Sequence, residues 1–361
     1  MAALAILALA IMLLALFAVT KPPSPNQTTT RRRAIGTWLY LWYGYNFTSH
    51  SWTGGLHSSH WNRTECGSYD VVKDRSDIGY YSSMSNGTLS WQLSNMKAAG
   101  VSVIGVSWWG TGNLTQVGGD SQCAEMDSAI NNATLNLFRY IESSKNLWNF
   151  HVFVMVEPFN KTYDMTPKDY ASVYDYIENN FYGPFSNVVQ YWQGKPLVSW
   201  FNSNWIRDYN EPLNRTFTTE LVGGYPNGVD WYFWEGMNFL DVNGSDAQPQ
   251  NYEYAPNIST DGEVGITPRY DDLYQRPNDY MRFDYKMNQG MYSCEWSHVL
   301  AHTDDVKLVM LYSWNEYHER SELEPYWDFT ATNSSEIAST LNFVTELESN
   351  YAVQTSSSCS S

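Results

Sequence analysis

Residues 101–108, Val-Ser-Val-Ile-Gly-Val-Ser-Trp, form a short apolar run that is rich in β-branched side chains. A run of this length and composition is typical of a parallel strand that is covered on both faces. Similar runs, rich in Val, Ile, Trp and Tyr, recur along the chain at 37–42, 150–156, 197–201, 229–234, 264–267 and 306–314. We therefore expect these runs to be the buried strands of one sheet.

Amphipathic stretches separate several of these runs. Their apolar residues recur at spacings of three and four, the pattern of a helix that covers a sheet, at 89–99, 131–144, 167–179 and 282–301. Strands that alternate with helices over roughly 300 residues predict an α/β fold, a single (β/α)8 TIM barrel, whose eighth strand is not identified. A doubly wound open sheet is the second candidate, but no Gly-rich phosphate loop follows the first run.

The amino-acid composition limits the classes of molecule that the protein is expected to bind. The 361 residues include 21 Lys and Arg against 38 Asp and Glu, which gives a formal net charge of −17. This balance argues against a nucleic-acid partner, because contacts to phosphates need a basic surface. Aromatic residues make up 16% of the chain. Rings with an apolar face and a polar tip suit sugar binding, although most rings of a folded protein fill its core.

The N-terminal segment indicates export. Residues 1–20 are almost wholly apolar, and Lys21 and the Arg run 31–33 follow them. This pattern predicts a signal peptide or a membrane anchor at 1–20 and a polar, basic linker at 21–33. One folded domain then spans 34–352, and a Ser-rich tail spans 353–361. We expect a secreted or membrane-anchored protein with this domain on the extracytoplasmic or lumenal side.

Two further features fit that compartment. Acceptor sequences for N-glycosylation begin at Asn26, Asn46, Asn62, Asn86, Asn113, Asn132, Asn160, Asn214, Asn243, Asn257 and Asn333. They predict a glycosylated surface, although a chain rich in Asn, Ser and Thr also generates such sequences by chance. The four cysteines, Cys66, Cys123, Cys294 and Cys359, are an even number that is compatible with disulfides, with their pairing left open.

Aromatic rings and carboxylates follow the ends of the expected strands. These groups lie at 42–44, 107–109, 157–159, 267–270 and 314–319. In a barrel of this kind the carboxyl ends of the strands carry the chemistry. Each group alone is compatible with a structural role, but together they predict a cleft with aromatic walls and acids at its floor, which suits an enzyme that holds and cuts a polysaccharide.

Glu316 and Glu319 are the sharpest pair of candidates. Their spacing places both side chains on one face of a helical turn, about 5 to 6 Å apart. Retaining glycosidases hold their two carboxyl groups about 5 to 5.5 Å apart. Mutual repulsion also separates the two pKa values, so that one group can act as an acid while the other acts as a base. This spacing of two glutamates is common on solvated helices. The position of Glu316 and Glu319 at the end of an expected strand is what indicates a catalytic pair.

The segment Ser-Trp-Asn-Glu-Tyr-His-Glu at 313–319 closely resembles the Trp-Asn-Glu-Trp-His-Glu stretch of the family 99 glycoside hydrolases, the endo-α-1,2-mannosidases and mannanases. Further segments that resemble this family follow in the same order, at 42–44, 60–62, 79–83, 107–108, 157–159, 270–277 and 324–325. The resemblance covers most of 36–325. Three departures are Tyr317 in place of Trp, Arg320 in place of Gly, and Trp109-Gly110 in place of Tyr-Pro.

The resemblance implies a (β/α)8 catalytic domain that cuts α-mannosidic bonds within a chain, with retention and without a metal or cofactor. It further implies that the 2-hydroxyl of the sugar attacks the anomeric carbon and gives a 1,2-anhydro intermediate. Glu316 then takes the 2-hydroxyl proton, and Glu319 protonates the leaving oxygen and activates water. The residues that the resemblance assigns to substrate binding are Trp42, Tyr43, His60, Trp108, Glu157, Tyr270 and Asn315. The expected partner is an α-mannan or a mannose-containing oligosaccharide.

Other interpretations stay open at this stage. Cys294, His298 and His302 share one helix face at a spacing of four, which could bind zinc, although a fourth ligand is not evident. His50, His57 and His60 fall in a Gly- and Ser-rich loop that suits sugar contact better than metal binding. The alternative functions are a non-catalytic carbohydrate-binding surface protein and a related enzyme that acts on another α-glycan.

Overall fold

The computed structural model describes residues 34–61, 64–65, 68–69, 72–113, 123–157, 167–201, 218–222, 258, 262–275, 282–283 and 291–327, and all structural statements concern these. They all belong to the unit Arg33–Ser361. Within them, none of the helices is both long and apolar enough to cross a bilayer. The signal peptide or anchor at 1–20, the linker at 21–33 and the tail at 353–361 lie outside the described residues.

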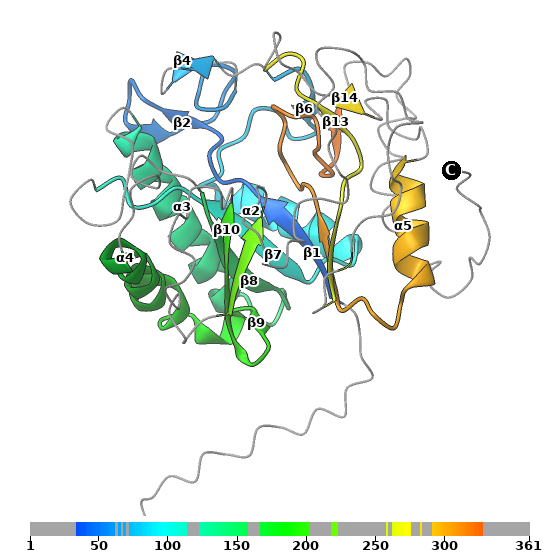
Figure 1. Ribbon diagram of the computed structural model, residues 1–361. Coiled ribbons are helices and arrows are strands. Elements are labelled where there is room, and N and C mark those ends of the chain that lie inside the picture. The colour runs from blue at the N-terminus through cyan, green and yellow to red at the C-terminus, as the bar shows by residue number, and fades with distance from the viewer. Residues whose placement is uncertain are drawn as a thin grey trace, which may run out of the picture. The chain divides into compact units, whose positions relative to one another are not determined.

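The domain is built around one curled sheet of parallel strands (Figure 1). Its strands are β1 (Ala34–Leu39), β7 (Val103–Trp108), β8 (His151–Val156), β10 (Lys195–Phe201), β11 (Thr218–Val222), β12 (Glu263–Ile266) and β15 (Leu308–Leu311). In space they follow the order β11-β10-β8-β7-β1-β15-β12, and the two-residue strand β9 (Tyr191–Trp192) pairs antiparallel with β10. Every pair along that order is parallel.

This order is the one that a TIM barrel requires. From β1, the strands β7, β8, β10 and β11 follow one another in both chain and space, and β15 and β12 continue on the other side of β1. A strand between β11 and β12 would close the sheet, and the expected strand at 229–234 lies outside the described residues. The fold is therefore TIM-barrel-like, with seven parallel strands in barrel order.

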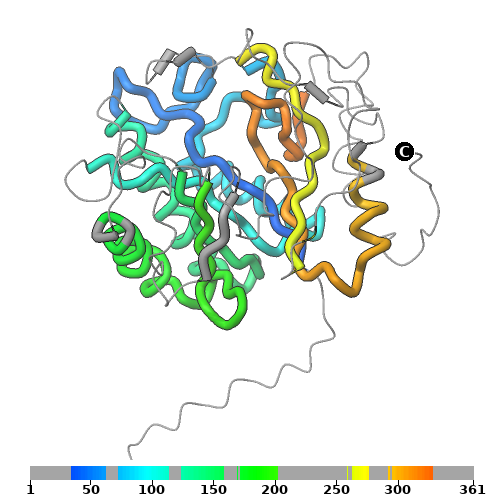
Figure 2. Tube along the Cα trace, viewed as in Figure 1, coloured from blue at the N-terminus to red at the C-terminus, as the bar shows by residue number. Residues whose placement is uncertain are grey.

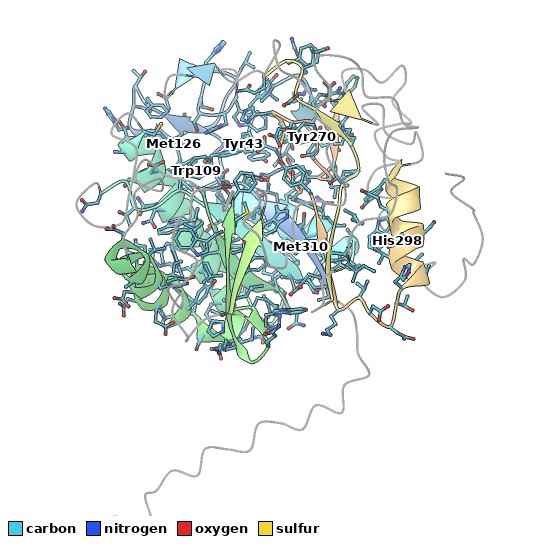
Figure 3. The ribbon with its side chains drawn as sticks, in the orientation of Figure 1. Tyr43, Trp109, Met126, Tyr270, His298 and Met310 are labelled. Atoms are coloured by element: carbon cyan, nitrogen blue, oxygen red, sulfur yellow. The ribbon has the colours of Figure 1, made fainter. Side chains whose placement is uncertain are left out.

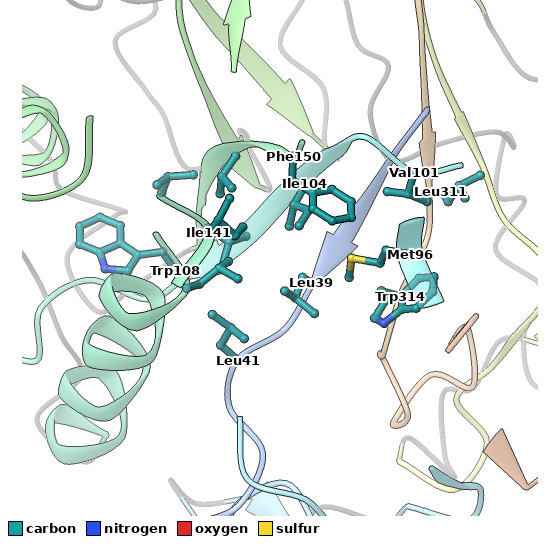
Figure 4. Packing of buried hydrophobic residues seen from close by; sticks show 14 of the residues in the cluster. Leu39, Leu41, Met96, Val101, Ile104, Trp108, Ile141, Phe150, Leu311 and Trp314 are labelled. Carbon is teal, nitrogen blue, oxygen red and sulfur yellow. The ribbon is translucent and has the colours of Figure 1, made fainter. Parts of the chain in front are cut away.

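Alternate residues of the strands divide the core into two layers. Trp38 and Phe153 point to the concave side, where their rings meet edge to face at 5.4 Å. Leu39 and Ile104 point to the helix side, where they pack with Met96 of the first helix (Figure 4). Because both faces are buried, the strands are continuous apolar runs, which is the pattern that made them recognisable in the sequence.

The helices cover the outer layer. They are α2 (Asn86–Ala98), α3 (Ala124–Ser143), α4 (Pro167–Ile177), which runs into a π-helical turn (Glu178–Tyr182), and α5 (Met291–Ala301); a 3₁₀ turn spans Ser186–Val188. Three expected helices are confirmed. The fourth, expected at 282–301, is wrong in its first part because Arg282–Phe283 forms strand β14, which pairs with β13 (Tyr270–Asp271).

Two strands end earlier in the chain than expected. The first strand covers 34–39 rather than 37–42, and the last covers 308–311 rather than 306–314. Beyond both ends, the side chain of Asn315 replaces the strand pairing. Its Oδ1 accepts the Tyr40 N–H at 2.8 Å, and its Nδ2 donates to the Tyr40 carbonyl at 2.8 Å. Strand β11 was not expected at all, because its sequence Thr-Thr-Glu-Leu-Val lacks a long apolar run.

Short strand pairs lie beyond the carboxyl ends of the central strands (Figures 1 and 2). These pairs are β2 (Tyr45–Asn46) with β3 (Ser51–Trp52), β4 (Thr64–Glu65) with β5 (Ser68–Tyr69), β6 (Arg75–Ser76) with β16 (Tyr326–Trp327), and β13 with β14. They belong to the loops that follow β1, β12 and β15. The described parts of these three loops therefore contain paired strands, which help to fix side chains over the strand ends.

Gly105 gives a test of the inner layer. A Cβ at this position would lie 2.4 Å from two ring carbons of Trp38 and 2.9 Å from Phe153. We expect Gly105→Ala to lower the free energy of unfolding by about 2 kcal/mol, because a full core cannot accept another methyl group. Denaturant unfolding measures the loss. Gly87→Ala on α2 is the matched control, since its Cβ would make only an ordinary contact with Ser85. Equal stability of the two variants would contradict the packing.

Candidate active site

Three glutamates lie at the carboxyl ends of β8 and β15. Glu157 directly follows β8, and Glu316 and Glu319 lie in the turn that follows β15. Glu157 and Glu316 are buried, and Glu319 is half-buried. The three act on one another electrostatically, because the charges of Glu316 and Glu319 both raise the pKa of Glu157. The structure thus brings together both expected catalytic residues and one expected binding residue.

Glu316 is held by its own turn. Its N–H donates to the Ser313 hydroxyl at 2.7 Å, and its Oε1 accepts the His318 N–H at 3.0 Å. The His318 ring places Nδ1 3.2 Å from the same Oε1 and Nε2 3.3 Å from the His60 carbonyl, so both ring nitrogens face acceptors, which an imidazolium satisfies. Burial raises the pKa of Glu316, and the contacts with His318 partly offset that rise.

The turn that carries Glu316 and Glu319 is not helical. Residues 317–320 form a turn, and the Ser321 N–H donates to the Glu316 carbonyl at 3.1 Å. The expectation of a helical turn is therefore wrong, because these bonds and the buried side chains around them give the turn its own path. The two carboxylates nevertheless interact, since the charge of Glu319 raises the pKa of Glu316.

Two tyrosines complete the floor of the site. The Tyr312 hydroxyl donates a short hydrogen bond to Glu319 Oε2. Burial raises the pKa of Tyr40 well above its ordinary value, and the charges of Glu157, Glu316 and Glu319 add to this rise. Sequence reasoning missed both hydroxyls. The signal was present, because Tyr40 lies two residues after the inward-facing Trp38, and Tyr312 lies two residues after the inward-facing Met310.

Glu157 has a strongly raised pKa. Burial raises its pKa to about 8 from 4.5, and the Ser107 hydroxyl, which donates to Oε1 at 2.7 Å, opposes that rise. The same hydroxyl accepts the Trp109 ring N–H at 3.2 Å. Near neutral pH the Glu157 carboxyl is therefore largely protonated, and it can donate a hydrogen bond as well as accept one.

Asn315 and Tyr43 fix the turn rather than the floor. Both side chains are fully buried. The Asn315 amide bonds both backbone groups of Tyr40, and the Tyr43 hydroxyl donates to the Asn315 carbonyl at 2.8 Å and accepts the Tyr317 N–H at 3.1 Å. The resemblance assigns both residues to substrate binding, whereas in the structure their hydrogen bonds hold the turn that carries Glu316 and Glu319.

The buried carboxyl of Glu324 also holds this turn, through the side chain of Tyr317. Glu324 accepts hydrogen bonds from the Tyr317 hydroxyl at 2.6 Å and from Gln92 Nε2 at 2.8 Å. Burial raises its pKa to about 7, while these donors and the hydroxyls of Tyr81 and Ser76 oppose the rise. Tyr317 is therefore anchored at both its backbone and its side chain, which leaves its ring no freedom to follow a substrate.

Aromatic rings form one side of the site. Trp42 stacks on Tyr40 at 4.6 Å and on His60 at 4.4 Å between ring centroids. The His318 ring lies 5.1 Å from His60, and the half-buried Trp109 lies 6.3 Å from Trp42. The expected binding residues Trp42 and His60 therefore lie next to Glu316. Stacked rings of this kind suit the apolar faces of sugars.

Trp108 and Trp109 exchange the roles expected for them. Trp108 is fully buried, stacks on Tyr176 at 5.6 Å and donates its ring N–H to Asn131. It belongs to the cluster on the helix side of the sheet (Figure 4). The placement of Trp108 at the substrate is therefore wrong, because successive side chains of a strand point to opposite faces. Trp109, a departure from the family pattern, instead lies on the side of Glu157, because its ring N–H donates to the Ser107 hydroxyl that bonds Glu157.

Tyr270 lies in β13, beyond the carboxyl ends of the strands on the same side as Tyr43 and Trp109, whereas Met310 lies within the sheet (Figure 3). It is buried in the same inner cluster as Tyr312. The charge of Tyr270 adds to the rise in the Tyr312 pKa, whose main cause is burial. Tyr270 therefore lies close to the hydroxyl that bonds Glu319, as an expected neighbour of the site.

The other sequence hypotheses fall elsewhere. His298 lies on α5 and His302 directly follows this helix, with ring centroids 4.3 Å apart, while the side chain of Cys294 lies outside the described residues. His50 is exposed and pairs with Glu125 at 2.7 Å. Among the residues that the structure describes, no cluster of three or more His, Cys, Asp or Glu could hold a metal ion. Cys123 forms a disulfide bond.

Comparison with known proteins identifies the fold. The chain matches none of the known protein-family profiles, and no curated protein matches it in sequence. Among solved structures it is similar to the GH99 endo-alpha-mannosidase of Bacteroides thetaiotaomicron in complex with bis-tris-propane, at a TM-score of 0.58 and 17% identity over 90% of this chain and 100% of that one. A second structure of a GH99 endo-alpha-mannosidase from that organism gives a TM-score of 0.55 and 16% identity over the same shares. The resemblance found in the sequence is confirmed at the level of the fold.

The raised pKa of Glu157 predicts a pH dependence of stability. The folded protein keeps this proton up to about pH 8, whereas an ordinary glutamate loses it near 4.5. The folded state therefore binds more protons between these values, and the free energy of unfolding falls as the pH rises through them. In Glu157→Gln we expect the free energy of unfolding to decrease less steeply with pH, by up to about 1.4 kcal/mol per pH unit. Denaturant unfolding from pH 5 to 8 measures this slope.

The exposed Glu178 on the π-helical turn supplies the control for this titration. Glu178→Gln should leave the slope of stability against pH as it is in the wild type. A slope that Glu157→Gln does not change would show that the Glu157 carboxyl is ionised at neutral pH, contrary to the argument from burial.

Proposed function

We propose that this protein is a glycoside hydrolase that cuts α-mannosidic bonds within mannan or N-glycan-type oligosaccharides, with retention of configuration. The observation that carries the proposal is the group of three mutually interacting glutamates, Glu157, Glu316 and Glu319, at the carboxyl ends of the strands and beside stacked rings. The sequence resemblance of 313–319 to family 99 and the shared fold support the choice of reaction.

The environment of each glutamate suits a step of that reaction. Burial makes Glu316 a stronger base than an ordinary glutamate, so it can take the proton of the sugar 2-hydroxyl as that oxygen attacks the anomeric carbon. Glu319, bonded by Tyr312, gives a proton to the leaving oxygen. A 1,2-anhydro sugar results. Glu319 then takes a proton from water, the water opens the anhydro ring at the anomeric carbon, and Glu316 returns its proton to the 2-oxygen.

The remaining parts of the site fit a sugar substrate. The Glu157 carboxyl, neutral near pH 7, can donate to a sugar hydroxyl at the floor. The rings of Trp42, His60 and Trp109 form one aromatic group with the His318 ring that contacts Glu316, and the half-buried Trp109 is the most accessible tryptophan of this group. A complete (β/α)8 barrel over 34–352 is the scaffold that we propose, and the barrel order of the seven strands supports it.

The cellular location follows from the same proposal. We infer a secreted or membrane-anchored glycoprotein whose catalytic domain lies on the extracytoplasmic or lumenal side. The disulfide at Cys123 supports an oxidising compartment. The acceptor residues Asn86, Asn113 and Asn132 are exposed, as a glycan requires.

The test is a chromatographic product assay on α-mannans and glucosylated oligomannose. We expect the wild type to release internal oligosaccharides, and Glu316→Gln and Glu319→Gln to cut about 10² to 10⁴-fold more slowly, the usual contribution of a positioned acid or base. Glu142→Gln on α3 is the control, because this carboxylate lies beside Lys145 and Asn187, apart from the site. It should cut like the wild type.

Three outcomes would overturn the proposal. Wild-type rates in both glutamine variants would remove Glu316 and Glu319 from the reaction. A wild type that cuts neither substrate but is retained on a mannan affinity gel would indicate the non-catalytic binding protein instead. A wild type that neither cuts nor binds mannan would direct the search to other α-glycans.

A further inference from the structure

Arg320, the residue directly after Glu319, has an unusual backbone. Its φ is +48°, in the left-handed region that favours glycine. Its side chain is nevertheless long, charged and only 1% exposed. A residue at such a φ persists only where the surrounding structure holds it there. The contacts of the guanidinium group must therefore account for the presence of an arginine.

The guanidinium group binds two carboxylates on different segments. Its Nε lies 2.8 Å from Asp74 Oδ2, and its Nη1 lies 2.7 Å from Asp271 Oδ2. Asp271 in turn donates its backbone N–H to the carbonyl of Glu319 at 2.8 Å. Glu319 is thus bracketed, because the residue after it and its own carbonyl are both tied to Asp271 in β13.

The second anchor, Asp74, is itself fixed. The same Oδ2 lies 2.8 Å from Arg269 Nη2, and Arg269 lies 2.5 Å from Glu322 Oε1, all fully buried. The positive charges of Arg269 and Arg320 lower the pKa of Asp74 against its burial, while burial raises that of Glu322. The two guanidinium groups therefore share Asp74, and each binds one further carboxyl group, Glu322 for Arg269 and Asp271 for Arg320.

We propose that Arg320 is a positioning residue that holds the backbone of Glu319, and through it the Glu319 carboxyl, in register with Glu316 by clamping the catalytic turn to Asp74 and Asp271. The inference rests on the proposed function, since it names what aligns the acid of that reaction. The clamp joins segments that are far apart in the sequence, at 74, 269–271 and 320–322.

The test uses Arg320→Gly. Glycine adopts the positive φ without strain, and the substitution removes the guanidinium group that binds Asp74 and Asp271. The vacated space keeps the carboxylates of Asp74 and Asp271, so free guanidinium ion should bind there. We expect kcat to fall about 100-fold, the cost of a small misplacement of a catalytic group, with KM little changed. Millimolar guanidinium chloride should restore kcat, and sodium chloride at the same concentration should not.

Two further variants keep the test decisive. Arg320→Lys retains the charge but cannot bind both carboxylates as a fork, so we expect an intermediate loss of kcat. It also serves if the glycine variant does not fold. Arg139→Lys, on the exposed face of α3, is the matched control and should keep wild-type kcat.

Hydrogen exchange tests the clamp formed by Arg320 independently of catalytic activity. We expect faster exchange in the peptide 313–325 of Arg320→Gly, restored by guanidinium, whether or not the wild type cuts mannan. If the wild type is inactive but exchange behaves in this way, the proposed function fails and the clamp stands. Unchanged exchange, or an unchanged kcat in Arg320→Gly, would overturn the clamp. A loss of activity through KM alone would also overturn it.

Discussion

Burial of carboxyl groups at the carboxyl ends of parallel strands is the constraint on which the rest of this structure depends. An ionised carboxylate loses a large hydration energy when it is buried, so each such group must find donors or keep its proton. Glu316 is met by His318, Glu319 by Tyr312 and Glu157 by Ser107. Burial and the charges of neighbouring glutamates raise the pKa values of Glu157 and Glu316 above those of ordinary glutamates.

The surrounding strands and loops hold these three glutamates in place. The alternate side chains of the strands fill the concave layer up to Trp38 and Met310, and the acids occupy the next level above it. The turn after β15 is then fixed from three sides, by Asn315 against β1, by Glu324 behind Tyr317, and by Arg320 against β13. Asn315, Glu324 and Arg320 all lie outside helices and strands, so their side-chain contacts rather than regular backbone pairing hold this irregular turn in place.

Sequence reasoning found the strands and the acids because both leave simple signals. Two-sided burial makes β7 and β8 continuous apolar runs, and the segment 313–319 is distinctive in itself. It could not find β11, which lacks such a run, nor the path of the turn at 317–320, which depends on partners such as Asp74 and Asp271 far away in the chain. Trp108 was misplaced because its neighbour Trp109 is equally aromatic. Only the alternation of the strand, counted from Ser107, separates the two.

Glu157, Glu316 and Glu319 act as one electrostatic site. The most direct measurement is a ¹³C NMR titration of the glutamate side-chain carboxyls, made on the wild type and on Glu316→Gln. A single electrostatic site predicts that the Glu157 carboxyl titrates near pH 8 and that its titration shifts to lower pH when the Glu316 charge is removed. A Glu157 resonance that titrates at the ordinary value, or one that does not respond to Glu316→Gln, would contradict it.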